Sequence, residues 1–292
     1  MRSGIIAVIG RANAGKSTLV NVLVGEKVAI VSPKPQTTRN SIMGVLTKPD
    51  YQLVFVDTPG IYKSSNKLSD IMMKTAEDAA KDVDFILFVH DGHGGLSDRD
   101  ISIMKKYVGG GIPSAIAYTK IDIMPKDRIA PDIQKLCENG VDVDVFPVSA
   151  RKGTNMANLE KFLAQSMPDG DKIIADDIVS DRSEKFMIAE IMREKILLKF
   201  DDEVPHGIAV IVNRFERGEN GVYDINLDIV CDKPNHKSIL IGRGGAAIKE
   251  VSSFARKSME SFLGAKVFLT TYVRVEEGWR DKMGLIKDMV IL

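Results

Sequence analysis

The chain is poor in several features that would assign it to a specialised class of protein. Its 292 residues include only two cysteines, Cys137 and Cys231, without C-x-x-C or Cys/His ligand spacing. This pattern excludes a disulfide framework and argues against a structural zinc site. Basic and acidic residues number 40 each, so no overall charge draws the chain to nucleic acid or to a membrane. Any affinity for an anionic partner must come from a local patch.

Long apolar runs are also missing. The run that follows Gly4 has only about six residues and ends in a glycine-containing loop, too short for a signal peptide or a transmembrane helix. We therefore expect a mature chain that begins at Met1 and works in the reducing cytoplasm. Apolar residues make up 44% and charged residues 27%, as in ordinary globular proteins. The length predicts two domains, each with its own core.

The first half alternates short apolar runs with amphipathic stretches up to about Met167. This β-α-β rhythm predicts an α/β domain with a mainly parallel, doubly wound sheet. Such a sheet binds its ligand beyond the carboxyl ends of the strands. The strands are expected at residues 5–9, 52–57, 85–90, 114–118 and 144–149.

The pattern stops near residue 170, and the polar stretch that follows is typical of a linker. We therefore predict a first domain at 1–170, a linker at 171–180 and a second domain at 181–292. The second domain shows the order α-β-β-α-α-β, which predicts an α+β fold. A helix is expected at residues 182–200 and strands at 208–215, 223–230 and 266–275. Between the second and third of these strands, two helices flank a glycine loop, and the second of them is expected at 246–258.

A phosphate-binding motif follows the first predicted strand. Residues 10–17 have the pattern G-x-x-x-x-G-K-S and are followed directly by a segment with helical periodicity. Backbone N–H groups of such a loop surround a phosphate, Lys16 neutralises the β and γ oxygens, and the Ser17 hydroxyl holds Mg²⁺. An ordinary tight turn is the alternative. We expect the loop to bind GTP through Gly10, Arg11, Asn13, Ala14, Gly15, Lys16, Ser17 and Thr18.

A second motif, D-T-P-G, ends the next predicted strand at Asp57 and Gly60. The Asp57 carboxylate can reach Mg²⁺ through water, and the Gly60 N–H can face the γ-phosphate. Alone, the motif is as typical of a capped turn. Upstream lies the proline-broken segment 32–39, in which we prefer Thr38 to Thr37 as the residue that closes on Mg²⁺. The predicted Mg²⁺ ligands are Ser17, Thr38 and Asp57.

Base recognition is assigned to the segment T-K-I-D. The Asp122 carboxylate can accept both the N1–H and the 2-amino group of guanine, with the Lys120 stem along the base. Adenine lacks that pair of donors, so GTP is favoured over ATP. After the last strand of the domain, Ser149 and Ala150 can present a backbone N–H to the guanine oxygen, although the pair alone means nothing. Together with Thr119, these residues complete the nucleotide site.

The hydrolytic machinery is less conventional. Ras-like enzymes orient the attacking water with a glutamine, but here Ile61 and Tyr62 follow Gly60. We therefore expect slow intrinsic hydrolysis of GTP to GDP and phosphate. The amide oxygen of Asn13 can coordinate K⁺ where an arginine finger would lie, and a role in stabilising the loop is the alternative. The catalytic residues are predicted to be Lys16, Asn13, Thr38 and Gly60.

The second domain contains the sequence G-R-G-G at residues 242–245, before a predicted helix. A GxxG loop in this setting clamps the backbone of single-stranded RNA. Residues 233–266 hold seven basic and two acidic residues, which concentrates positive charge around the loop. A helix-opening turn is the alternative. The predicted RNA-binding residues are Ile241, Gly242, Arg243, Gly244, Gly245 and Lys249.

These motifs resemble those of the Era family of bacterial-type GTPases, relatives of the TrmE and EngA groups. The resemblance rests on GRANAGKST, QTTR, DTPG, TKID and SA, and in the second half on SDRSEKFMIAEIMREKI and ILIGRGGAAIKE. It implies a KH domain of the type II order that binds small-subunit ribosomal RNA near its 3′ end during 30S maturation. Thr119 replaces the usual Asn and Ala12 the usual Pro, and neither change removes a phosphate contact.

The resulting hypothesis is a monomeric, cytoplasmic ribosome assembly GTPase. It would bind GTP or GDP with Mg²⁺, use K⁺ as a further cation, and be released from the 30S subunit on hydrolysis. A peripheral association with the inner face of the cell membrane stays open. One rival is a GTPase whose GxxG domain binds a protein or a membrane surface. Another is a non-catalytic RNA module with a vestigial loop, which the intact Lys16, Ser17 and Asp57 disfavour.

Overall fold

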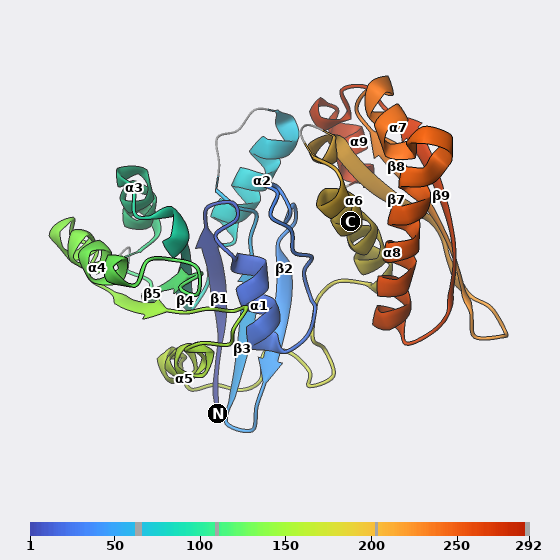
Figure 1. Cartoon of the computed structure of the whole chain (residues 1–292). Helices are drawn as coiled ribbons and strands as arrows, with labels where there is room; N and C mark the ends of the chain where they lie inside the picture. The colour runs from blue at the N-terminus through green and yellow to red at the C-terminus, as the bar shows by residue number, and fades with distance from the viewer. Residues whose placement is uncertain (62–65, 109–110, 202–203, 290–292) are drawn as a thin grey trace. The chain divides into compact units, whose positions relative to one another are not determined.

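The computed structural model describes residues 1–61, 66–108, 111–201 and 204–289 (Figure 1). The chain forms two compact units. The first comprises Met1–Ala29, Thr38–Lys63 and Met72–Asp181. The second comprises Ile30–Thr37, Ser64–Ile71 and Arg182–Leu292. Two short segments of the N-terminal half are therefore counted with the C-terminal residues.

The first unit is built on a six-stranded sheet with the order β2-β3-β1-β4-β5-β6. Its five parallel strands are β1 (Arg2–Gly10), β3 (Tyr51–Asp57), β4 (Phe85–Asp91), β5 (Ser114–Thr119) and β6 (Asp144–Pro147). This confirms the predicted mainly parallel sheet. The antiparallel edge strand β2 (Ile42–Thr47) was not predicted. It pairs with β3 across a short turn in which the Lys48 N–H donates to the Tyr51 carbonyl at 2.9 Å.

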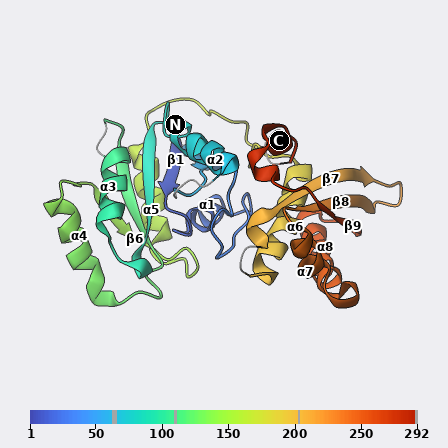
Figure 2. The ribbon, with the colours of Figure 1, turned by 90° about the horizontal axis from the view of Figure 1, so that it is seen from above.

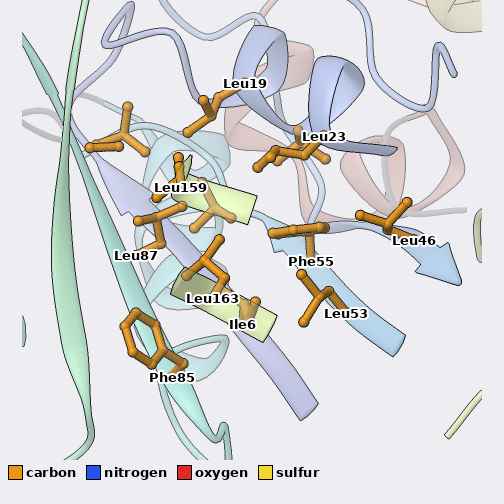
Figure 3. Close-up of a cluster of buried hydrophobic side chains, with 14 of the residues drawn as sticks. Ile6, Leu19, Leu23, Leu46, Leu53, Phe55, Phe85, Leu87, Leu159 and Leu163 are labelled. Atoms are coloured by element: carbon orange, nitrogen blue, oxygen red, sulfur yellow. The ribbon is translucent and has the colours of Figure 1, made fainter. Parts of the chain in front are cut away.

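Helices cover both faces of this sheet. They are α1 (Lys16–Val24), α2 (Lys67–Asp78), α3 (Asp98–Tyr107), α4 (Ile129–Glu138) and α5 (Met156–Ser166). In β1, Ile6 and Val8 pack toward α1 and α5, whereas Ala7 and Ile9 pack toward α3 and α4. The strand is continuously apolar because both of its faces are buried. Figure 3 shows the first of these two cores.

The second unit contains α6 (Glu184–Lys199), β7 (Ile208–Arg217), β8 (Tyr223–Cys231), α7 (Pro234–Ile241), α8 (Ala246–Leu263) and β9 (Val267–Val275). Strand β8 lies between β7 and β9, antiparallel to the first and parallel to the second. The order α-β-β-α-α-β is the predicted one. Helices α6 and α8 pack on one face of the sheet (Figure 2), where Ile225, Leu227 and Ile229 meet them.

The C-terminal tail is attached to this unit by Trp279. Its side chain is fully buried, and its indole N–H donates to the carbonyl oxygen of Gly207 at 3.0 Å. A short helix, α9 (Met283–Met289), follows and was not predicted from the sequence. Within the part of the chain that the structure describes, no helix has both the length and the apolar character needed to cross a membrane.

Candidate functional site

The phosphate-binding loop joins the end of β1 to the start of α1. Gly15 has φ 94° and Asn13 has φ 62°, left-handed conformations that Gly adopts freely and Asn tolerates. The Lys16 ammonium donates to the carbonyl oxygens of Gly10 and Arg11, each at 3.1 Å. The loop is thus wrapped around its own lysine, at the carboxyl end of the sheet where a ligand was expected.

The D-T-P-G segment packs directly against this loop. A Cβ at Gly60 would lie 2.5 Å from the Cα of Ala12, so only glycine fits there. The Ile61 N–H donates to the Gly10 carbonyl at 3.0 Å. The Arg11 side chain turns to Asp100 of α3, with 3.0 Å between Nη1 and Oδ1. Tyr62, which entered the prediction of slow hydrolysis, lies outside the described residues.

Three oxygen-bearing side chains meet beside the loop. Ser17 Oγ donates to Asp57 Oδ2 at 2.6 Å and lies 2.8 Å from Thr38 Oγ1. The other carboxylate oxygen, Asp57 Oδ1, is buried without a hydrogen-bond partner among the residues described here. Thr37, the alternative to Thr38, instead donates its hydroxyl to the Lys34 carbonyl at 2.6 Å. Two hydroxyls and a carboxylate with a spare oxygen fit Mg²⁺, which prefers oxygen ligands.

Burial shifts the pKa values of the two charged groups beside the loop, Asp57 and Lys16. It raises the pKa of Asp57 to about 6, although Lys16 and the hydroxyls of Ser17 and Thr38 oppose the shift. It lowers the pKa of Lys16 to about 8, with Asp57 opposing. Each group is therefore held in an environment that disfavours its charge. A bound cation and bound phosphates would relieve this cost.

The pKa of Asp57 predicts a pH-dependent affinity for Mg²⁺. Because Mg²⁺ binds the ionised carboxylate, protons compete below about pH 6, and the apparent affinity should fall about tenfold from pH 7 to pH 5. Titrations of Mg²⁺ against a fluorescent GDP complex measure this directly. The Asp57→Asn variant gives the baseline for protonation of the nucleotide itself. An affinity with the same pH profile in both proteins would contradict the assignment.

The predicted base-binding residues lie together at the ends of β5 and β6. The Ser149 hydroxyl donates to Asp122 Oδ1 at 2.7 Å, and this hydrogen bond is the main cause that lowers the pKa of Asp122. The Ser149 N–H donates to the Thr154 carbonyl at 3.1 Å, so its hydroxyl is what it contributes to this site. Asp122 is thereby held ionised and fixed in direction, while Ala150 follows Ser149 in the loop.

Lys120 links the base-binding segment to the phosphate loop. Its ammonium donates to the carbonyl oxygen of Asn13 at 2.7 Å and to Asp91 Oδ2 at 2.6 Å. Asp91 was missed in the sequence, although it ends an apolar strand just as Asp57 does. That position at a strand end was the signal that could have found it.

Thr119, which stands where the common form of the motif has Asn, connects β5 to the phosphate loop. Its Oγ1 lies 2.7 Å from the Ala14 carbonyl oxygen and 2.9 Å from the His90 carbonyl oxygen. A hydroxyl has one proton and can donate to only one of them at a time, whereas an amide NH₂ has two. Thr119 therefore ties β5 to the phosphate loop with one donor fewer.

The GxxG loop lies between α7 and α8 in the second unit. Gly242, Gly244 and Gly245 all have left-handed φ values, at 71°, 59° and 78°. Arg243 and Lys249 are exposed, and no side chain among the described residues caps the N-terminus of α8. Open helix N–H groups next to basic side chains suit phosphate oxygens. The six predicted RNA-binding residues are thus brought to one place on this unit.

The two units together define a class of protein, a P-loop GTPase that carries a KH domain. A family model described as "50S ribosome-binding GTPase" matches residues 5–120, and one described as "KH domain" matches residues 203–280. GTPase Era of Clostridium kluyveri is 43% identical over 289 residues, 99% of each chain. GTPase Era of Clostridium botulinum is 41% identical over 288 residues, 99% of this chain and 97% of the other.

Solved structures agree over the whole chain. Era in complex with MgGDPNP and nucleotides 1506–1542 of 16S ribosomal RNA is similar with a TM-score of 0.95, 34% identity and 99% of both chains covered. A variant of Aquifex aeolicus Era bound to GDP and AlF₄⁻ gives a TM-score of 0.95 at 33% identity, again over 99% of both chains. This chain belongs to the Era family and is a GTPase.

Proposed function

We propose that this chain is a GTP-dependent assembly factor that binds small-subunit ribosomal RNA near its 3′ end and acts in 30S maturation. The observation that carries the proposal is an intact GxxG loop on a chain whose nucleotide motifs also lie together. The similar Era structure that holds nucleotides 1506–1542 of 16S ribosomal RNA supports the same ligand class. In this proposal the G domain spans 1–170, the linker 171–180 and the KH domain 181–292.

The nucleotide would be held by groups from several strand ends. The phosphate loop and Lys16 bind the phosphates, Asp122 and Ala150 bind guanine, and Ser17, Thr38 and Asp57 hold Mg²⁺. When bound, Mg²⁺ neutralises charge on the β- and γ-phosphates. The packing of D-T-P-G on the phosphate loop supports the proposal that the Gly60 N–H faces the γ-phosphate.

The RNA role can be tested with a pair of matched glycine variants. Gly244 and Gly264 have nearly the same φ, 59° and 61°, and neither has an atom within 4 Å of an added Cβ. They flank opposite ends of α8, but only Gly244 belongs to the GxxG loop. Gly244→Asp should weaken binding of a single-stranded fragment from the 3′ end of small-subunit rRNA at least tenfold, because its carboxylate repels phosphates. Fluorescence anisotropy measures the affinity.

The control is Gly264→Asp, which carries the same backbone strain and the same charge. It should bind the RNA about as well as the wild-type chain, and GDP affinity should be unchanged in both variants. Equal losses in the two variants would contradict the role of the loop. Affinity for an anionic vesicle but not for RNA would favour the rival function at a membrane surface. We propose a cytoplasmic monomer, for which such vesicles should show no binding.

We also propose that K⁺ assists hydrolysis through Asn13. The Asn13→Gly variant keeps the left-handed backbone, since glycine adopts φ 62° freely, and removes the side chain together with its amide oxygen. Hydrolysis by the wild-type chain should be faster in K⁺ than in Na⁺ buffer, and the variant should lose this difference while it retains GDP affinity. A variant that still responds to K⁺ would instead assign Asn13 to stabilisation of the loop.

A further inference from the structure

The segment Ile30–Thr37 is held by helix α6. It belongs to the second unit, although its neighbours Ala29 and Thr38 belong to the first. Within the second unit, Glu194 accepts the N–H of Val31 at 3.1 Å. The guanidinium of Arg193 donates to the carbonyl oxygens of Gln36, at 3.4 Å, and of Thr37. Two adjacent side chains of α6 therefore hold both ends of the segment.

These two side chains are unusual for their burial. Arg193 is 3% exposed and Glu194 is 4% exposed, on a helix that otherwise contributes apolar residues to the core. Glu190 accepts from Arg193 Nε at 2.7 Å, and Lys195 pairs with Glu194 at 2.8 Å. Apolar residues would serve stability at such positions at least as well as buried charges. The charges are therefore better explained by the backbone groups that they bind.

The segment between the two ends is compact, so a displacement of one end would be passed to the other. Ser32 Oγ lies 2.7 Å from Thr37 Oγ1, and the Thr37 hydroxyl donates to the Lys34 carbonyl. Gln36 has a left-handed φ of 61°, which closes the turn. Lys34 also pairs with Asp201, just beyond the end of α6.

The connection to the nucleotide site is covalent. The Thr37 carbonyl, to which Arg193 donates, shares one planar peptide group with the Thr38 nitrogen. Its direction therefore limits where the Thr38 side chain can lie. In the first unit, the Thr38 hydroxyl lies 2.8 Å from Ser17 Oγ. We propose that Arg193 is a positioning residue that holds the Thr37–Thr38 peptide so that Thr38 serves Mg²⁺ and the γ-phosphate.

It follows that α6, a helix of the RNA-binding unit, distinguishes GTP from GDP. In this proposal Thr38 serves the γ-phosphate as well as Mg²⁺, so a triphosphate gains more than GDP from the arrangement in which α6 holds the segment. This inference rests on the role proposed above for Thr38. By linkage, loosening the hold should weaken binding of the triphosphate more than that of GDP.

The test uses the full chain and two probes, both with Mg²⁺. GDPNP, a non-hydrolysable analogue, represents GTP, and it is compared with GDP. The double variant Arg193→Met with Glu190→Gln removes the guanidinium without leaving a buried carboxylate unpaired. GDPNP affinity should fall about tenfold, the worth of one charge-assisted hydrogen bond, and GDP affinity should stay within about twofold. Arg193→Lys should be intermediate, since an ammonium keeps the charge but lacks the planar fork with which the guanidinium reaches Glu190 and the two carbonyls. The matched control is Arg214→Gln. It removes an exposed arginine of β7 in the same unit and should change neither affinity.

Two further variants separate the possible failures. Thr38→Ala should lower the GDPNP affinity relative to GDP; if it does not, the proposed role of Thr38 fails. If Thr38→Ala has this effect but the Arg193 variants keep the wild-type ratio, only the positioning role is overturned. Should the double variant not fold, Glu194→Met removes the acceptor of the Val31 N–H and loosens the other end of the segment. Equal losses for both nucleotides would also overturn the inference, because a structural defect has no preference for the triphosphate.

Discussion

Replacement of Lys16 by Ala is expected to reduce the affinity for both GTP and GDP by a factor of about 10²–10³. The Lys16 ammonium is buried, and the carbonyl oxygens of Gly10 and Arg11 direct it into the loop. Removal of one partner from a buried charge pair costs roughly 3–4 kcal/mol of binding free energy. Titration of fluorescent GDP, with GTP as the competitor, measures both losses.

The Lys16→Ala variant should bind nucleotide weakly because a phosphate contact is missing, and not because the protein is unfolded. Burial lowers the pKa of Lys16, which means that its charge is a burden to the unliganded fold. The melting temperature of the unliganded variant should therefore be no lower than that of the wild-type chain by more than a few degrees. Lys48→Ala, in the exposed turn between β2 and β3, is the control with unchanged affinity. A Lys16 variant within tenfold of wild type would contradict the phosphate-binding role.

The features that could be predicted from the sequence are those that neighbouring residues determine. The phosphate loop follows from consecutive residues, since G-x-x-x-x-G-K-S between a strand and a helix itself contains the glycine that turns left-handed at Gly15 and the lysine that follows it. The meeting of Ser17 with Asp57 follows from a rule of topology, because parallel strands bring their carboxyl ends to one edge of the sheet. The fold class was predicted for the same reason.

The features that could not be predicted depend on residues far apart in the chain. Strand β2 is short, and its pairing with β3, from Ile42 opposite Asp57 onward, is what makes it a strand. The contacts of Arg193 with Gln36 and Thr37 join residues more than 150 positions apart. In the sequence, Arg193 is one basic residue on an amphipathic helix, and such residues are usually solvated. Only the structure shows that its charge is buried and that it is directed at backbone carbonyls.

The second large effect is expected at the base-binding carboxylate. The Asp122→Asn variant should lose GDP affinity by a factor of about 10² or more and bind xanthosine diphosphate (XDP) better than GDP. Guanine presents two donors, N1–H and the 2-amino group, and an ionised carboxylate accepts both. Each hydrogen bond to a charged group is worth about 1.5–3 kcal/mol. Asparagine places its own NH₂ against one of these donors, so one bond is lost and a repulsion replaces it.

Xanthine has a carbonyl oxygen where guanine has the amino group, so it presents one acceptor and one donor to the asparagine amide. The Ser149 hydroxyl, which donates to Asp122 Oδ1 at 2.7 Å, can donate equally to the amide oxygen and should keep the new side chain in place. Competition of GDP and XDP against a fluorescent nucleotide measures the switch, and Asp127→Asn in the following loop is the matched control. A variant that lost GDP without gaining XDP would show only damage to the loop. A reversed preference requires Asp122 to face the base, because no distant effect distinguishes an amino group from a carbonyl on one ring carbon.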